Sequence, residues 1–191
     1  MADQIEPLML FVPADLGLEQ RHEWVEAILD ELREKDLVKA GTEDAWRSML
    51  VETATVGLHP IAVAQFLMVL PGAQPVYVWA TVGEQPSGRP ESLMESIAGE
   101  VVKPFGARKS RIQVDAVSVD VGLFMAREEQ EGSSDVVYLL GGAATSLTLE
   151  GIGETDVCLW FTGTELSELP ESLPALARFI RDPDMAAFLT L

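Results

Sequence analysis

Residues 61–82 of this chain read I-A-V-A-Q-F-L-M-V-L, then P-G-A-Q-P, then V-Y-V-W-A-T-V. The two outer runs are rich in β-branched and aromatic residues, and the Pro-Gly segment between them is a strong turn signal. This arrangement predicts an antiparallel hairpin with strands at 61–70 and 76–82. The second strand is apolar on both faces, which is typical of a strand in the middle of a sheet. The stretch therefore predicts an antiparallel sheet that other elements cover.

The rest of the chain supplies further strands and helices to such a sheet. Apolar runs bounded by turn residues predict strands at 8–12, 112–127, 135–140, 145–150 and 156–162, the first being alternatively a tucked-in arm. Apolar residues at helical spacing predict helices at 18–37, 93–102 and 166–181. Residues 43–58 fit either a helix or a strand. Short connections imply antiparallel pairing, so we predict one α+β domain over residues 1–191, with about seven strands and about three helices.

Local signals refine these boundaries. Ser92 followed by Glu95 fits the capping-box pattern at the start of a helix. The pair Gly141-Gly142 reads as a turn that separates two strands. The acidic stretch 128–135 is a further turn, and the alternation of 112–127 changes phase after residue 121, which predicts a bulge or bend there.

The charge of the chain excludes several classes of partner. Its 191 residues carry a formal net charge of −18, and nucleic acids and anionic membrane surfaces require clustered Lys and Arg. We therefore expect no nucleic-acid and no membrane partner. The N-terminus lacks a positive n-region and no apolar run approaches the roughly 18 residues of a membrane span, so we expect a cytoplasmic protein. The absence of Asn and the excess of Arg over Lys indicate a GC-rich bacterial genome, and salt adaptation is a second explanation for the acidity.

The sequence offers no recognisable catalytic set. Cys158 is the only cysteine, and His22 and His59 are the only histidines, so a tetrahedral zinc site cannot be assembled. No nucleophile elbow and no Walker loop is present. We expect His22 to be a solvated helix residue and His59 to make a local hydrogen bond. These observations predict no metal, no cofactor and no catalytic residues, and they favour a non-enzymatic protein.

One basic run stands out in the acidic chain. Residues 103–113 read K-P-F-G-A-R-K-S-R-I-Q and contain Lys103, Arg108, Lys109 and Arg111. Lys103-Pro104 closes the predicted helix, so the run is expected at the helix exit and in the loop that follows. Two interpretations remain open. The run binds an unknown protein partner, an anion or another copy of the chain, or it is a solvated loop.

Two hypotheses about function follow from these features. The leading hypothesis is a protein–protein interaction module that uses the basic residues and the apolar C-terminal residues Phe188, Leu189 and Leu191. The alternative is a small-molecule binding protein or enzyme with an apolar pocket on a sheet face near Trp79 and Trp160. Buried core residues are the competing interpretation of those two aromatics.

The order of elements near the C-terminus resembles that of a known family. The strand D-V-C-L-W-F-T (156–162) is followed by the loop T-E-L-S-E-L-P (164–170) and the helix L-P-A-L-A-R-F-I (173–180), and several antiparallel strands and a helix precede them. This order resembles the PsbP-like family over the C-terminal half of the chain. The resemblance implies an α/β/α sandwich and, because most members are interaction proteins, a binding role without catalytic residues.

Overall fold

Seven antiparallel strands form one continuous sheet in the described residues of the computed structural model. The structure describes residues 7–70, 75–83, 89–128, 136–163, 169–182 and 185–189. The strands, in chain order, are β1 (Leu8–Phe11), β2 (Ala64–Val69), β3 (Val76–Val82), β4 (Gly106–Val114), β5 (Val117–Glu128), β6 (Val136–Leu149) and β7 (Gly153–Gly163). Their order across the sheet is β1-β2-β3-β7-β6-β5-β4. The predicted α+β class with a seven-stranded antiparallel sheet is therefore confirmed.

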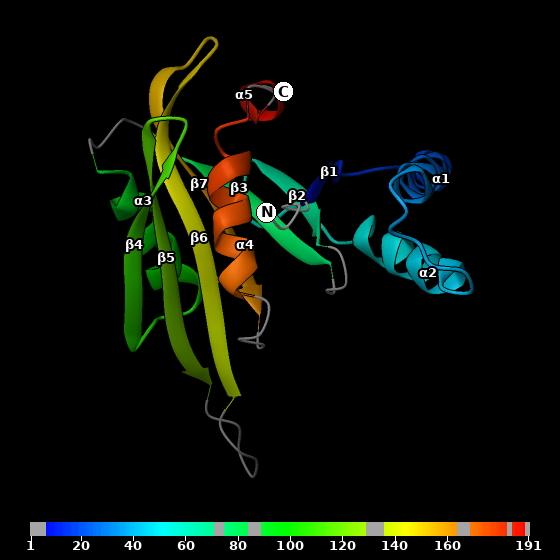
Figure 1. Ribbon diagram of the computed structural model, residues 1–191, viewed down its shortest axis with the longest axis horizontal. Helices are drawn as coiled ribbons and strands as arrows, with labels where there is room; N and C mark the ends of the chain where they lie inside the picture. Colours follow the sequence, from blue (N-terminus) through cyan, green and yellow to red (C-terminus); the bar gives the residue numbers. More distant parts are fainter. Residues whose placement is uncertain are drawn as a thin grey trace, which may run out of the picture.

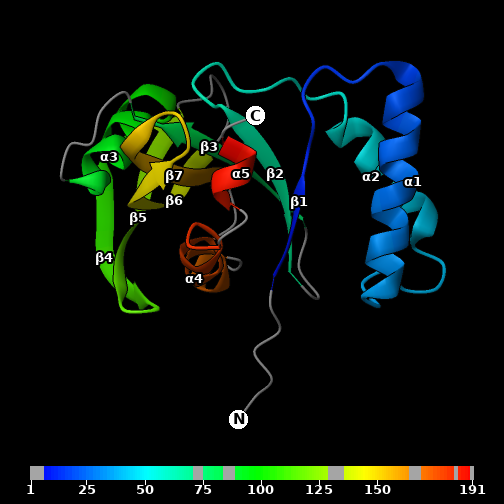
Figure 2. The same ribbon diagram turned by 90° about the horizontal axis from the view of Figure 1, so that it is seen from above.

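Helices cover both faces of this sheet. They are α1 (Leu18–Glu34), α2 (Glu43–Thr53), α3 (Pro90–Val101), α4 (Leu169–Phe179) and the short α5 (Met185–Leu189). The sheet curves around α4, with α5 on the same concave face, while α1, α2 and α3 lie on the convex face (Figures 1 and 2). The described residues thus contain five helices rather than about three, because the ambiguous segment 43–58 holds α2 and the tail holds α5.

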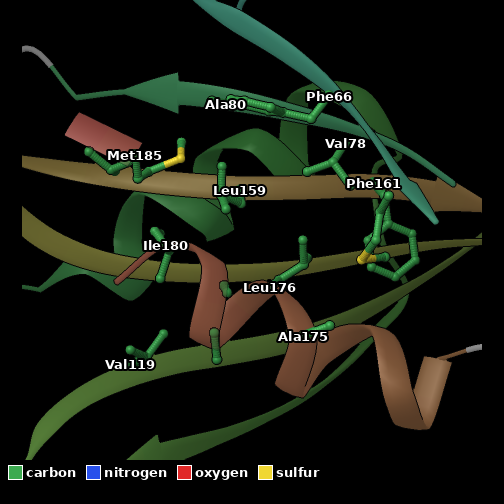
Figure 3. Packing of buried hydrophobic residues seen from close by; sticks show 14 of the residues in the cluster. Phe66, Val78, Ala80, Val119, Leu159, Phe161, Ala175, Leu176, Ile180 and Met185 are labelled. Carbon is green, nitrogen blue, oxygen red and sulfur yellow. The ribbon is translucent and has the colours of Figure 1, made fainter. Parts of the chain in front are cut away.

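The concave face carries the largest hydrophobic core. One face of α4 packs on β6, β5 and β4. Leu176 and Ile180 are fully buried in a cluster that also holds Leu159 and Phe161 of β7 (Figure 3). Met185 of α5 is also fully buried in this cluster. Burial of large apolar side chains is the dominant stabilising term in folding. The sheet and α4 therefore share the main hydrophobic core of the fold.

The convex face carries two separate clusters. Buried residues of α1 and α2, such as Leu29 and Leu50, pack on Leu67 and Val69 of β2. Farther along the sheet, Met94 and Ile97 of α3 pack in a second cluster with Cys158 and Trp160 of β7. The segment between α2 and β2 crosses the convex face between the two clusters (Figure 2).

Two predicted boundaries are wrong, and both errors concern turns. The segments 135–140 and 145–150 are one strand, β6, because Gly141 and Gly142 continue the ladder opposite Phe161 and Trp160. A side chain built at Gly141 would approach the Phe161 ring to 2.5 Å, so glycine gives room for packing here and does not make a turn. Conversely, the predicted strand 112–127 is two strands, β4 and β5.

The turn between β4 and β5 has no glycine. It is formed by Asp115 and Ala116, with φ angles of 48° and 65°. Both residues are in the left-handed region, as a tight hairpin turn requires. The predicted capping box is also absent, since Arg89 is the N-cap of α3 and no side chain caps it. The predicted turns at 71–74 and 129–135 lie outside the described residues.

Candidate interaction site at the edge strand

The basic run begins where α3 ends. The helix closes at Val101, and the Lys103 N–H donates to the Ala98 carbonyl over 3.1 Å. Lys103 has a φ of 47°, in the left-handed region that commonly ends a helix. The structure thus places Lys103 at the helix exit that the sequence predicts, and its side chain is exposed.

The rest of the basic run is a strand and not the expected loop. Arg108, Lys109 and Arg111 belong to β4, which among the described strands is the last of the sheet and pairs only with β5. Only Ile112 and Val114 of this strand pack against the concave core. An edge strand with so few core contacts has a weak apolar pattern, which is why the sequence favoured a loop.

The cations of β4 project from both faces of the sheet. Lys109 and Arg111 are on the convex face, where Lys109 pairs with Glu95 of α3 and the Arg111 Nε donates to Asp120 of β5 over 2.7 Å. Arg108 is four positions before Ile112, which faces the concave core. Because side chains alternate between the two faces along a strand, Arg108 lies on the concave face, opposite to Lys109 and Arg111. Among the described residues, neither Arg108 nor Lys103 has an ion-pair partner.

A groove of about 350 Å³ runs beside these residues on the convex face. It lies between the first turns of α3 and the strands β4 and β5. Its lining residues are Arg89, Glu91, Met94, Lys109, Ser110, Arg111, Asp120 and Val121. Three cations and two carboxylates therefore surround an apolar floor.

Ion pairs hold the charged groups of the groove in place. The Arg89 Nε lies 3.1 Å from a Glu91 carboxylate oxygen. A hydrogen bond from its own backbone N–H, and then the bond from Arg89, lower the pKa of Glu91 below its ordinary value. The hydrogen bond to Asp120 and the attraction of its charge raise the pKa of Arg111. Both shifts favour the charged forms of Glu91 and Arg111, which suits the binding of a charged or polar segment.

An exposed aromatic residue lies at the beginning of this edge. Phe105 is 63% exposed, and the Arg127 guanidinium lies 5.8 Å from the centre of its ring. The Phe105 N–H donates to the Met125 carbonyl of β5 over 2.8 Å, so its backbone is held against the sheet. A fixed, exposed ring beside a cation is a suitable contact for an apolar side chain.

The aromatic pair predicted as a pocket is in contact. The rings of Trp79 and Trp160 are 4.8 Å apart, and the His59 ring lies against both. Trp160 is fully buried and its Nε1 donates to Thr81 Oγ1 over 3.0 Å. Trp160 is therefore a core residue, whereas Trp79 is half-buried. His59 also accepts a local hydrogen bond at Nδ1 from the Ile61 N–H, as predicted.

The apolar C-terminal residues dock on the chain itself. The Phe188 ring stacks on Phe11 of β1 at 5.4 Å, and its edge meets Phe66 at 5.8 Å. Leu189 is buried against the concave core, and Leu191 lies outside the described residues. This packing makes Phe188 and Leu189 part of the fold, so the interaction hypothesis now depends on the basic edge.

Sequence reasoning missed several residues of the site. These are Arg89, Glu91, Phe105, Asp120 and Arg127. A correct prediction of the turn at 115–116 would have paired Arg111 with Asp120, because a tight hairpin fixes the register of its two strands. No sequence signal places Arg89 beside β4, because that proximity depends on how α3 packs on the sheet.

Among the residues that the structure describes, no group of three or more His, Cys, Asp or Glu side chains is placed to hold a metal ion. In the same part of the chain, no helix is long and apolar enough to cross a membrane.

No protein-family model matches the sequence, and a search of curated proteins also finds no match, so the similarity to the PsbP-like family stays a prediction from element order.

Proposed function

We propose that this chain is a non-enzymatic protein–protein interaction module that acts through the basic edge of its sheet. The observation that carries the proposal is the position of the cations. In a chain with a net charge of −18, Lys103, Arg108, Lys109 and Arg111 gather along one exposed strand and the turn before it. A cluster of positive charges on an acidic protein attracts an acidic partner. It also weakens the repulsion between this surface and the acidic surface of another copy of the chain. A bacterial cytoplasmic setting belongs to the same proposal and is supported by composition alone.

Lys103 and Arg108 are the two cations best placed to bind a partner. Lys109 and Arg111 already have carboxylate partners, so a ligand must compete for them. Lys103 and Arg108 are exposed and have no ion-pair partner among the described residues. Their charge is available to a partner without the loss of an internal contact.

The experiment reverses those two charges and compares the result with a matched control. The test variant carries Lys103→Glu and Arg108→Glu, and the control carries Lys35→Glu and Lys39→Glu, which are also exposed and change the net charge equally. Proteins captured by the wild type and the control, but not by the test variant, are purified and measured by calorimetry. Equal capture and equal affinity for all three proteins would overturn the proposal.

A second candidate function is small-molecule binding beside Trp79. Gln65 and Trp79 are directly opposite one another on β2 and β3. The buried Gln65 Oε1 and Trp79 Nε1 have no hydrogen-bond partner among the described residues. Buried polar atoms normally have a partner, so a neutral ligand with a donor and an acceptor is supported at this position. A metabolite that raises the thermal midpoint of the wild type, but not of Trp79→Phe, would favour this function.

A further inference from the structure

We infer that the partner of the basic edge is an extended acidic segment that pairs with β4 and adds an eighth strand to the sheet. This inference rests on the proposed function and specifies the chemistry and the geometry of the partner. It follows from the free backbone of β4, from the placement of its charges, and from the poor fit of a second copy of this chain at the same edge.

The backbone of β4 supports pairing with another strand. It is nine residues long and, within the part of the chain that the structure describes, pairs on one side only, with β5. In an antiparallel pair, alternate residues direct their N–H and C=O groups away from the partner. About half of the backbone groups of β4 therefore face outward, as in other proteins that bind a peptide by strand addition. At roughly 3.4 Å per residue, the edge accepts about 30 Å of extended chain.

The side chains of β4 specify an acidic partner. Arg108 projects on the concave face, and Lys109 and Arg111 project on the convex face. Residues directly opposite one another in neighbouring strands share a face, and opposite charges at such positions stabilise the pairing. A partner strand with acidic residues opposite all three cations meets a positive charge on each face. The groove adds a further cation on the α3 side, Arg89, which is paired with Glu91.

The exposed Phe105 ring specifies an apolar residue at one end of the partner. The ring lies just before the first residue of β4 and beside Arg127. Its backbone already continues the pairing with β5 through the bond to Met125. An aliphatic side chain opposite Phe105 would bury this ring, which is one of the large exposed apolar side chains of the described chain.

A second copy of this chain fits the edge poorly. In a symmetric antiparallel pair of β4 strands centred on Ser110, Lys109 of each copy faces Arg111 of the other copy. Moving the centre of the pair by one residue places Lys109 opposite Lys109 or Arg111 opposite Arg111 of the other copy. Like charges directly opposite one another destabilise strand pairing, and charges on edge strands prevent edge-to-edge association in this way. The edge therefore disfavours pairing with a second copy of β4 and favours pairing with an acidic strand.

A designed peptide tests strand addition directly. The peptide Val-Glu-Thr-Glu-Glu-Val-Thr-Leu, with blocked ends and a fluorescent label, places Glu opposite Arg111, Lys109 and Arg108 and Leu opposite Phe105 in an antiparallel pair. Two further peptides carry N-methyl groups on the odd or on the even backbone amides, which removes the N–H donors from one edge of the strand. Binding is measured by fluorescence anisotropy, and the protection of 106–114 is measured by hydrogen exchange.

The expected outcome has a specific pattern. The parent peptide binds, and residues 106–114 gain protection from hydrogen exchange. One methylated peptide loses about tenfold or more in affinity relative to the parent. The other methylated peptide binds much better than the first. Replacing Glu by Gln, or using the Lys103→Glu and Arg108→Glu protein, weakens binding, whereas the Lys35→Glu and Lys39→Glu control binds like the wild type.

Two results would overturn the inference. If both methylated peptides bind as well as the parent, the cations act without backbone pairing, and the proposed function survives while strand addition fails. If the parent peptide shows no binding at about 1 mM, strand addition also fails. The capture experiment above then decides the proposed function separately, because it does not depend on this peptide.

Discussion

Arg111 lies directly opposite Asp120 on the β4–β5 pair, and its Nε donates to the Asp120 carboxylate over 2.7 Å. The two side chains differ in exposure, at 59% for Arg111 and 14% for Asp120. The carboxylate is therefore the more desolvated partner and depends on the guanidinium. This arrangement makes Arg111 a structural residue of the edge as well as part of its positive surface.

The first prediction separates these two roles. Arg111→Glu places a carboxylate opposite Asp120 and close to Glu91, so we expect a clearly lower thermal midpoint. Arg108→Glu has no such neighbour among its described contacts and should leave the midpoint almost unchanged. The double variant Arg111→Glu with Asp120→Arg restores the opposite charges and should recover part of the loss. Equal midpoints for the two single variants would contradict this assignment.

A second prediction concerns the glycines of β6. An alanine Cβ at Gly141 would lie 2.5 Å from the Phe161 ring, a rigid group that cannot move aside easily. We expect Gly141→Ala to lower the free energy of unfolding by about 1–3 kcal/mol. The control is Gly99→Ala on α3, where no atom lies within 4 Å of the new Cβ and where alanine should stabilise the helix by about 0.5–1 kcal/mol. Chemical denaturation measures both. Similar effects of the two substitutions would show that close packing at Gly141 is not what selects glycine.

These glycines also show what the sequence could not reveal. Local patterns predicted the fold class and the strands β1, β2, β3 and β7, because alternation and turn residues act within a few positions of one another. They merged the end of β4 with β5 and divided β6 into two strands. The role of Gly141 depends on Phe161, which is twenty positions away and becomes its neighbour only when β6 pairs with β7. A glycine that makes room for a ring and a glycine that makes a turn look the same in sequence.

The candidate site was predicted in part for a related reason. The charge run alone identified Lys103, Arg108, Lys109 and Arg111, since it stands out in an acidic chain. Its secondary structure was missed because an edge strand needs few apolar residues, and Ile112 and Val114 are the only ones in β4 that pack on the core cluster. The groove was missed because Arg89 and Asp120 meet the strand only through tertiary packing.

A third prediction concerns the turn between β4 and β5. Ala116 has a φ of 65°, a conformation that costs an L-residue roughly 1–2 kcal/mol and costs glycine almost nothing. Ala116→Gly also creates the Asp-Gly pair that two-residue hairpins favour. We expect it to raise the free energy of unfolding by up to about 1 kcal/mol. Ala107→Gly in the same strand should lower it by about 0.5–1 kcal/mol. Denaturation of the two variants decides the matter, and a loss of stability in both would mean that the turn is not strained.

A fourth prediction uses the buried thiol of Cys158. The side chain is fully buried, and desolvation raises the pKa of this thiol. The cysteine thiol of the unfolded chain loses its proton at about pH 8.5, whereas the buried thiol of the folded chain keeps its proton. Below that pH both states are protonated and the thiol has no effect on the pH dependence. Above it the unfolded state is favoured, and stability falls by about 1.4 kcal/mol per pH unit from this group.

The matched variant for this experiment is Cys158→Ala, which removes the thiol and keeps a small apolar side chain. Other groups titrate in the same range, so the informative quantity is the difference in free energy of unfolding between the wild type and the variant. That difference should shrink as the pH rises from about 8 to about 10, because only the wild type loses the thiol contribution. In the same range a thiol reagent should modify Cys158 only after unfolding, since the thiolate is the reactive form. A constant difference, or rapid modification of the folded protein, would show that the β7 core admits solvent at Cys158.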